Sequence, residues 1–509
     1  MPSSAAPASS SPGSAGMLAP FVNELDKIAP SFQIHGSQIQ VIRTPADFYE
    51  TLKAKIRSAK TRVFLSTLYI GKSEKELPVS FATILTILGE DYDVARGLAR
   101  QSEAHPEHLD RCVTRNSRSA QPVMRVTTCP LITEFGPERV EIRMYHTPNL
   151  TGLRKKHVPT RINEGWGLQH MKLYGVDDEI ILSGANLSSD YFTNRQDRYH
   201  LISSREITEY FARLYAGVTS LSFRVEPSEE AAGFTLQWPS TNTAPSPLEK
   251  PAQYVAKATK VMNSLITPQS TAQTTVTKDG QASDTTIFML AQLSQLLKPD
   301  TSTELPAVTH ILKTLAAPQY AGSSWTFTAG YFNPAPSLTQ LLMSSASTNC
   351  TVITASPQAN GFYGSKGVSG MLPDAYTYLA RRFLMAIKQQ KRESDITLKE
   401  WRKGTVGEPE GWTYHAKGLW VTLPNESGPS MTVVGSSNYT KRSYSLDLEA
   451  GALVVTENAD LKKRLADEQK WLQEYAAPVT IDDLAKTERR VSFKVRMAMW
   501  FVQLVGGAL

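Results

Sequence analysis

A motif that occurs twice constrains the fold of this chain more than any other feature of its sequence. The first copy begins at His170 and the second at His415. In each copy a lysine follows at the second position after the histidine, at Lys172 and Lys417, and a small-residue turn ending in asparagine comes later. Two copies of one half-site predict a single composite site and a fold that brings the copies together.

The elements around the two copies follow the same order. In each half, a helix and then an apolar strand are expected before the motif, and a strand and then an amphipathic helix after it. The expected ranges are 45–60, 61–71, 200–204 and 205–218 in the first half, and 304–315, 323–333, 450–456 and 459–476 in the second. Repetition of one element order indicates a duplicated domain. We therefore expect an α/β fold of two duplicated domains, each a mixed β-sheet flanked by helices, packed as a pseudo-dimer with the active site between them.

The chain divides into five regions by composition and pattern. The expected regions are a disordered Ser/Ala/Pro-rich N-terminus (1–24), a first domain (25–225), a Ser/Thr/Pro-rich insertion with a helix near 250–266 (226–284), a second domain (285–480) and a basic then apolar tail (481–509). Residues 78–130 are anomalous within the first domain because they show no clear period. The apolar run at 79–88 fits either a strand or a helix.

Strand geometry explains the spacing of the motif. Alternate side chains on a strand point to the same face, so each histidine is expected beside its lysine. A neutral imidazole can attack phosphorus, and an ammonium group can bind phosphoryl oxygens. Asn186 and Asn438 add amide hydrogen bonds to this set. Asp197 and Glu449 follow their asparagines at equal offsets, and a carboxylate there is expected to fix the tautomer of a histidine.

Several weaker features leave alternatives open. The loop containing Arg154, Lys155, Lys156 and Arg161 is either a grip for phosphate-bearing substrates or a solvated basic loop. The glycine-rich segment 360–370 either cradles a phosphate with its backbone N–H groups or serves only as a connection. The C-terminal tail either lies in a membrane interface or forms a buried helix.

Composition limits the function classes further. The net charge of +6 is mild, and no long basic stripe with interleaved aromatic residues is present, which argues against a nucleic-acid partner. The three cysteines have no spacing typical of a disulfide framework or a metal site. No apolar run is long enough to cross a bilayer, so no ordinary transmembrane helix is expected. The segment 1–16 contains neither acids nor arginines, and no clear presequence is evident.

The motif pattern His-x-Lys-x4-Asp-x6-Gly-x-Asn resembles that of the phospholipase D superfamily. The first copy fills every place, including Asp177 and Gly184, whereas the second copy has Thr422 in place of the aspartate. Longer strings resemble a narrower family, the eukaryotic phosphatidylglycerophosphate synthases. These strings are GVDDEIILSGANLSSDYFTNRQDRY, MYHTP, ITASPQANGFYGSKG and HAKGLW. The resemblance extends over residues 30–75 and 131–475, and residues 78–130 depart from the family.

The resemblance implies a phosphatidyl transfer without metal or cofactor. CDP-diacylglycerol is the donor and glycerol 3-phosphate the acceptor, at a mitochondrial inner membrane with an anionic surface. The first half-site is complete, so His170 is expected as the nucleophile and His415 as the general acid/base, with the reversed roles as the alternative. Both lysines and both asparagines then hold the phosphoryl oxygens. Asp177 belongs to the family's catalytic motif, but its absence from the second copy favours a turn or supporting role.

Two other interpretations compete with this one. A phosphodiesterase of the same superfamily would use water as the acceptor and release phosphatidic acid. A catalytically inactive membrane-associated homologue is suggested by Thr422 and by the anomalous passage at 78–130.

Overall fold

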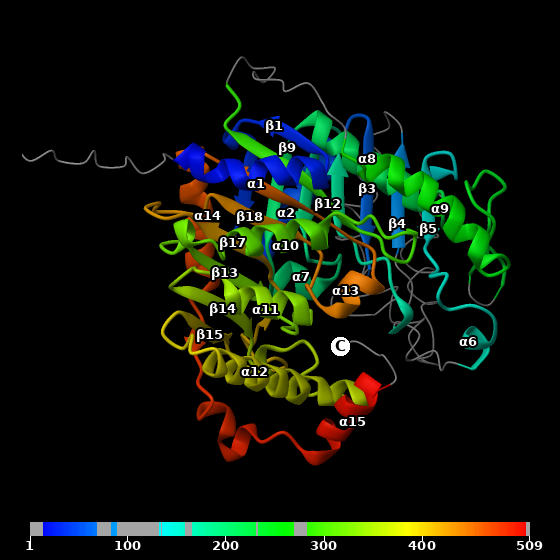
Figure 1. Ribbon diagram of the computed structural model, residues 1–509. Coiled ribbons are helices and arrows are strands. Elements are labelled where there is room, and N and C mark those ends of the chain that lie inside the picture. Colours follow the sequence, from blue (N-terminus) through cyan, green and yellow to red (C-terminus); the bar gives the residue numbers. More distant parts are fainter. Residues whose placement is uncertain are drawn as a thin grey trace, which may run out of the picture.

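Two nine-stranded β-sheets form the centre of the molecule (Figure 1). The first is antiparallel throughout, and the second is mixed. The computed structural model describes residues 14–68, 83–88, 132–133, 135–157, 165–230, 233–268 and 282–504. The first sheet has the order β11-β10-β5-β4-β3-β6-β7-β9-β2, and the second has the order β1-β12-β19-β18-β17-β13-β14-β15-β20. The α/β class expected from the sequence is confirmed.

The bounds of the strands follow. The first sheet contains β2 (Ile39–Ile42), β3 (Arg62–Thr67), β4 (Thr83–Leu88), β5 (Val140–Met144), β6 (Leu173–Val176), β7 (Glu179–Ser183), β9 (Tyr199–Ser203), β10 (Phe223–Pro227) and β11 (Phe234–Gln237). The second contains β1 (Ser31–Ile34), β12 (Thr285–Gln292), β13 (Ser324–Ala329), β14 (Cys350–Ala355), β15 (Ile396–Trp401), β17 (Lys417–Thr422), β18 (Met431–Gly435), β19 (Glu449–Thr456) and β20 (Ala476–Pro478).

The two sheets match strand for strand around the motifs. Read in one direction, β9-β7-β6-β3-β4-β5 corresponds to β19-β18-β17-β13-β14-β15. The two sheets differ in the direction of one pair of corresponding strands. β14 runs parallel to both of its neighbours, whereas β4 runs antiparallel to both of its neighbours. β4 shows that the described part of the ambiguous run at 79–88 forms a strand, and the rest of the anomalous passage lies outside the described residues. We infer a duplicated origin from the matching order.

Helices pack on the outer faces and into the core shared by the halves, and local sequence explains where they begin. Thr44 accepts a hydrogen bond from the backbone N–H of Asp47 and begins α2 (Pro45–Ser58), which buries Phe48, Leu52 and Ile56 along one face. The other long helices near the sheets are α8 (Arg205–Thr219), α9 (Pro251–Ile266), α10 (Glu304–Thr314), α11 (Pro336–Ser344), α12 (Leu372–Gln389) and α14 (Ala459–Leu472). α9 is the helix expected within the insertion.

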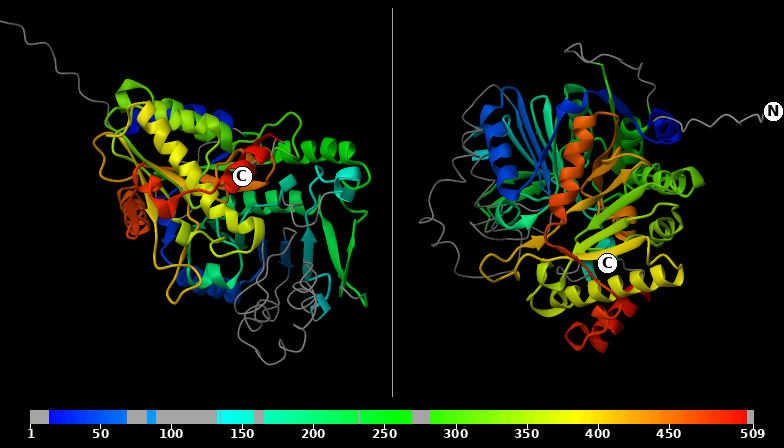
Figure 2. Two further views of the ribbon diagram at one scale, coloured as in Figure 1. Left: turned by 90° about the horizontal axis from the view of Figure 1, so that it is seen from below. Right: turned by 90° about the vertical axis from the view of Figure 1, so that its left-hand side faces the viewer.

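The two halves share one hydrophobic core. Leu173 and Leu182 of the first half pack in the same buried cluster as Trp420 and Val434 of the second. Two further clusters lie on the outer faces, one in each half. Because strands β6 and β17, which follow the motif histidines, contribute to the shared core, packing of the halves determines where the two motifs meet. Figure 2 shows the halves side by side in two further views.

The expected disorder of residues 1–24 is wrong from Ser14 onward. Helix α1 (Ser14–Ile28) buries Leu18, Phe21 and Leu25 against the second half, in contact with α10. β1 then pairs with β12, also in the second sheet, before β2 enters the first sheet. The Ser/Ala/Pro composition concealed an apolar stripe long enough for one helix face. We therefore propose second-domain bounds that include residues 14–34 together with 285–478.

The described part of the tail includes a helix that is buried on one face and exposed on the other. Helix α15 (Phe493–Leu504) packs on α12 through Val495 and Met499, which contact Ala375. Its other face exposes Phe493, Met497 and Trp500. No helix in the described part of the chain is both long and apolar enough to cross a bilayer.

Candidate active site

The two motif histidines lie just before their strands rather than within them. His170 precedes β6 and His415 lies between β16 (Thr413–Tyr414) and β17. Their backbones bond across to the opposite half. The N–H of His170 donates to the carbonyl of Leu448 over 2.8 Å, and the N–H of His415 donates to the carbonyl of Gln196 over 2.8 Å. The expectation that each histidine is a strand residue is therefore wrong, because these segments are used to join the halves.

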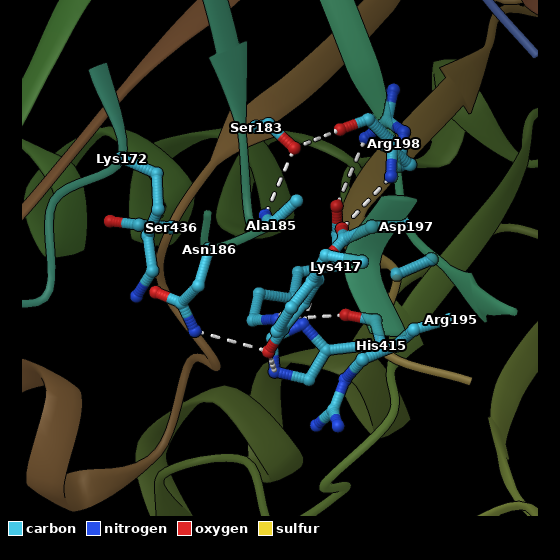
Figure 3. Close-up of polar contacts among 12 residues, drawn as sticks. Lys172, Ser183, Ala185, Asn186, Arg195, Asp197, Arg198, His415, Lys417 and Ser436 are labelled. Carbon is cyan, nitrogen blue, oxygen red and sulfur yellow. Dashed lines mark hydrogen bonds and ion pairs between the residues drawn. The ribbon is translucent and has the colours of Figure 1, made fainter. Parts of the chain in front are cut away.

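The carboxylates are exchanged between the halves. His415 of the second half bonds through Nδ1 to Oδ2 of Asp197 of the first half over 2.6 Å (Figure 3). His170 of the first half bonds through Nδ1 to Glu449 of the second half, at 2.8 and 3.0 Å to the two carboxylate oxygens. Each pair is buried. The hydroxyl of Ser436 donates to Glu449. Each histidine–carboxylate pair is therefore shared between the halves.

Burial disfavours the charged form of both imidazoles. Burial lowers the pKa of His170 well below its usual value, and the charge of Lys172 lowers it further. The pKa of His415 is also well below its usual value, first from burial and then from Lys417 and Arg195. A neutral ring that donates Nδ1–H to a carboxylate presents an unprotonated Nε2, the form needed for nucleophilic or general-base chemistry.

The motif lysines are fully buried beside the histidines. Nζ of Lys172 donates to the carbonyl of His170 over 2.6 Å, and Nζ of Lys417 donates to the carbonyl of His415 over 2.7 Å. Burial lowers the pKa of Lys417 to about 8. A Cβ at Gly184 would come within 2.9 Å of both Lys417 Nζ and the Asp197 carboxylate. Glycine in the small-residue turn thus leaves the room that these charged groups occupy.

The two motif asparagines are placed differently. Asn186 accepts from the backbone N–H of Leu68 over 3.2 Å and donates to the hydroxyl of Tyr191 over 3.2 Å. The side-chain oxygen of Asn438 is buried and has no hydrogen-bond partner among the described residues. A buried unpaired polar atom is costly unless a ligand satisfies it. Asn438 is therefore the asparagine with an unused hydrogen-bond acceptor among the described residues.

Asp177 lies outside the site, which corrects its expected place among the catalytic residues of the motif. Its carboxylate accepts hydrogen bonds from the backbone N–H groups of Lys60, Thr61 and Arg62, at 2.9, 2.8 and 3.1 Å. Its φ of 50° places it in the left-handed region of a turn between β6 and β7. The aspartate of the motif therefore supports the start of β3, the turn role favoured by its absence from the second copy.

The predicted basic loop is exposed. Arg154, Lys155 and Lys156 lie on the short helix α6 (Gly152–His157), and none is buried. The charge of Lys155 adds to burial in lowering the pKa of His146 to about 4. Arg161 lies outside the described residues.

Tyr191 and Arg195 are site residues that the motif pattern did not include. Tyr191 lies on α7 (Ser189–Thr193), and its hydroxyl lies 3.3 Å from Nε2 of His415. Arg195 lies on β8 (Arg195–Gln196), which pairs with β16, and its guanidinium carbon is 4.6 Å from the centre of the Tyr191 ring. Both lie between Asn186 and Asp197, so proximity to the motif was the only sequence signal for them.

A buried charge network joins the halves behind the site. Arg198 donates to Glu468 through Nε and Nη2, at 2.9 and 2.8 Å. Through Nη1 it also donates to the carbonyls of Lys417 and Val433. The guanidinium thus holds the backbone of a motif lysine from the opposite half. Among the described residues, no group of three or more His, Cys, Asp or Glu side chains is placed to hold a metal ion.

Two histidine–lysine half-sites with exchanged carboxylates lie on two sheets of matching strand order, in agreement with the phospholipase D-like pattern of the two motifs. The fold is supported by the crystal structure of phosphatidylserine synthase from Haemophilus influenzae Rd KW20, which matches with a TM-score of 0.63 at 15% identity, over 96% of this chain and 97% of that one. No family model matches the chain.

Curated relatives identify the particular family. The chain is 38% identical over 506 residues to the CDP-diacylglycerol--glycerol-3-phosphate 3-phosphatidyltransferase of Saccharomyces cerevisiae, covering 95% of this chain and 93% of the relative. It is 33% identical over 496 residues to the mitochondrial enzyme of that name from Homo sapiens, covering 92% and 83%. The chain belongs to the CDP-diacylglycerol–glycerol-3-phosphate 3-phosphatidyltransferase family.

Proposed function

We propose that this protein transfers the phosphatidyl group of CDP-diacylglycerol to glycerol 3-phosphate, giving phosphatidylglycerophosphate and CMP. The observation that carries the proposal is the pair of histidine–carboxylate contacts exchanged between the halves, in a chain that belongs to this family. A two-step transfer at one phosphorus needs a nucleophile and a separate proton carrier, and the exchanged pairs supply one of each.

His170 is the nucleophile in this proposal. Its Nδ1 is held by both oxygens of Glu449, and its Nε2 has no hydrogen-bond partner among the described residues. Its side chain is 11% exposed, against 5% for His415. In the first step, Nε2 of His170 bonds to the diacylglycerol-linked phosphorus as the bond from that phosphorus to the CMP oxygen breaks.

His415 moves the proton in the second step. Its Nε2 accepts the proton of the glycerol 3-phosphate hydroxyl while the new oxygen–phosphorus bond forms and the phosphorus–His170 bond breaks. Asp197 on Nδ1 stabilises the resulting imidazolium. The Tyr191 hydroxyl beside Nε2 keeps the ring oriented before the acceptor enters.

In this proposal three groups hold the phosphoryl oxygens. Lys172 and Lys417 bring buried positive charge to the two histidines, and Asn438 donates from its side-chain NH2 group. Charge stabilisation in a buried site is worth more than the same contact in water. Asn186 contributes indirectly, because its amide is bonded to Tyr191.

The reaction products test this function. The purified protein is incubated with labelled CDP-diacylglycerol in detergent micelles, with and without glycerol 3-phosphate. We expect phosphatidylglycerophosphate as the main lipid product, and a phosphatidyl adduct that forms without acceptor and is absent from His170→Ala. Phosphatidic acid as the only lipid product would establish the phosphodiesterase alternative, and absence of any turnover would favour the inactive homologue.

The surface around α6 and α15 is proposed to contact an anionic membrane. Both helices lie at the same end of the molecule (Figures 1 and 2). α15 exposes Phe493 (74%) and Trp500 (56%), and Leu153 of α6 is 76% exposed beside the basic residues of that helix. Apolar side chains next to lysine and arginine are typical of interfacial binding. The lipid substrate would enter from such a surface.

Vesicle binding distinguishes specific attachment through this surface from nonspecific adsorption to lipid. Co-sedimentation with vesicles containing phosphatidylglycerol is expected to exceed that with phosphatidylcholine alone, and Phe493→Glu with Trp500→Glu should abolish the difference. Val495 and Met499 stay in place against α12, so the helix is retained. Equal binding of the variant would contradict the assignment. Vertebrate relatives are named mitochondrial, and by that likeness we propose a mitochondrial inner-membrane location.

A further inference from the structure

Arg195 lies beside His415 with a hydrogen-bonding atom that the described part of the protein leaves unused. Its Nη1 donates to Asp190 over 3.0 Å and its Nη2 to the hydroxyl of Tyr331 over 2.9 Å. Its Nε is buried and has no hydrogen-bond partner among the described residues. The rings of Tyr331 and Tyr191 both stand edge-on to His415, with ring centres 5.5 and 5.2 Å away. Figure 3 shows the guanidinium next to the His415 ring.

The glycine-rich segment closes over this guanidinium. A Cβ at Gly361 would come within 3.0 Å of both Nη1 and Nη2 of Arg195 and within 2.8 Å of the Tyr331 hydroxyl. A backbone that passes so close to a cation leaves no room for a side chain. The segment expected to serve either as a phosphate cradle or as a connection therefore forms one wall of the Arg195 environment.

The repeat shows that the position of Arg195 does not carry a cation in both halves. Asp190 and Arg195 follow Asn186 at the same two offsets at which Arg442 and Asp447 follow Asn438. Both are ion pairs, at 3.0 Å each, but with the charges inverted. The position of Arg195 is thus a carboxylate in the other half. There Asp447 accepts from the backbone N–H of Leu168 over 3.0 Å, and its charge only partly opposes the burial that lowers the pKa of His170.

The geometry of the proposed reaction indicates which substrate group would contact Arg195. Displacement at phosphorus places the attacking and leaving atoms roughly in line. With His170 as the attacking group, the leaving CMP oxygen lies on the side of His415. The hydroxyl of glycerol 3-phosphate must enter from that same side in the second step. In CMP the reacting oxygen belongs to the phosphate monoester itself, and in glycerol 3-phosphate the phosphate monoester is at the other end of the three-carbon chain that carries the reacting hydroxyl.

We propose that Arg195, backed by Gly361 and Tyr331, binds a phosphate monoester on the His415 side of the site. The group is the phosphate of CMP as it leaves, and then the phosphate of the glycerol 3-phosphate that replaces it. This proposal rests on the transferase function proposed above. Arginine suits the role because its planar donors match phosphate oxygens, and Nε is free to join the bond.

Acceptor selectivity tests the subsite in the intact enzyme. Glycerol has the same reacting hydroxyl as glycerol 3-phosphate but no phosphate. In Arg195→Gln, kcat/KM for glycerol 3-phosphate should fall on the order of 10- to 100-fold, the range for loss of a charged hydrogen bond. Activity with glycerol should fall much less, so the ratio of the two collapses. Arg195→Lys should recover part of the ratio, and inhibition by CMP should weaken in Arg195→Gln.

The outcomes separate the two phosphates and the merely structural role. Loss of acceptor selectivity alone assigns the subsite to glycerol 3-phosphate, and weaker CMP inhibition alone assigns it to the leaving nucleotide. If neither changes in Arg195→Gln, the proposal is overturned. It is also overturned if Asp190→Asn, which keeps the guanidinium, loses as much selectivity as Arg195→Gln. A wild-type protein that forms no phosphatidylglycerophosphate would instead refute the transferase function itself.

Discussion

Replacement of Glu468 by glutamine should destabilise the junction between the halves more than any surface change. The carboxylate accepts hydrogen bonds from Arg198, His200 and Trp420, with four donor–acceptor distances between 2.8 and 3.0 Å. Both charged side chains of the Arg198–Glu468 pair are 1% exposed. Removing one partner of such a pair leaves an uncompensated buried charge, which costs about 3–5 kcal/mol. We expect Glu468→Gln to lower the unfolding free energy by that amount.

Urea unfolding followed by tryptophan fluorescence measures this loss, and Trp420 is itself a partner of the carboxylate. Asp483→Asn is the matched control, because the Asp483–Lys486 pair is exposed and surface pairs contribute little. The double variant Arg198→Met with Glu468→Leu should recover most of the stability. It should not recover activity, because Arg198 also holds the carbonyls of Lys417 and Val433.

The pH dependence gives the same prediction a second check. Burial alone would raise the pKa of Glu468, but the Arg198 charge and His200 hold it well below the usual value. A lowered carboxyl pKa contributes stability above the unfolded value, roughly pH 4.5, and the contribution is lost as the pH falls below it. The difference in unfolding free energy between wild type and Glu468→Gln should be constant above about pH 5 and become smaller in acid. A difference in unfolding free energy under about 1 kcal/mol at pH 7 would show that the Arg198–Glu468 pair does not stabilise the junction as argued.

Three further predictions concern the site. Asp197→Asn and Glu449→Gln should each reduce kcat on the order of 10³- to 10⁴-fold, measured as CMP release, because each leaves a histidine without its carboxylate; a loss in only one would break the exchanged-pair scheme. Burial raises the pKa of Glu449 to about 7, so kcat should rise with pH through about 7 as this carboxyl loses its proton, and that limb of the rate–pH profile should be absent from Glu449→Gln. Asp177→Ala should cost about 1–3 kcal/mol in urea unfolding through its lost backbone hydrogen bonds while KM for both substrates stays within about twofold, and a selective loss of kcat without loss of stability would return Asp177 to the chemistry.

Much of the fold was predictable because the motif and its neighbours repeat. Helix α2 was placed by Phe48, Leu52 and Ile56, whose spacing is a local property. The N-terminal helix was missed because Ser, Ala and Pro dominate residues 1–24, and only packing against α10 shows that Leu18 and Phe21 are a core face. The crossing of β1 into the second sheet depends on β12, a partner strand from the other half of the chain, which no local pattern encodes.

The site was predictable in its residue types but not in its pairing. Equal offsets from the asparagines identified Asp197 and Glu449 as carboxylates of the site, yet the offsets carry no information on which histidine each one meets. The structure exchanges them between the halves. Arg195 was missed for a related reason, because the residue at the matching place in the second copy has the opposite charge.

The exchange explains how a duplicated site can become asymmetric without losing either half. Each histidine is held by a carboxylate from the other copy. Loss of either copy would therefore remove a carboxylate from the remaining histidine. The two halves must also stay packed together for His170 and His415 to keep their carboxylates. Residues near the junction of the halves that do not contact the histidine of the other half can differ between the two copies. The aspartate of the first motif is a turn residue at β6–β7, and its replacement by Thr422 left the second half-site intact. The pairs Asp190–Arg195 and Arg442–Asp447 have the same spacing and inverted order, so the ninth residue after each asparagine is a cation in one half and a carboxylate in the other. In the transfer proposed above, the cation at this position lies on the His415 side, where the nucleotide leaves and the phosphate-bearing acceptor enters.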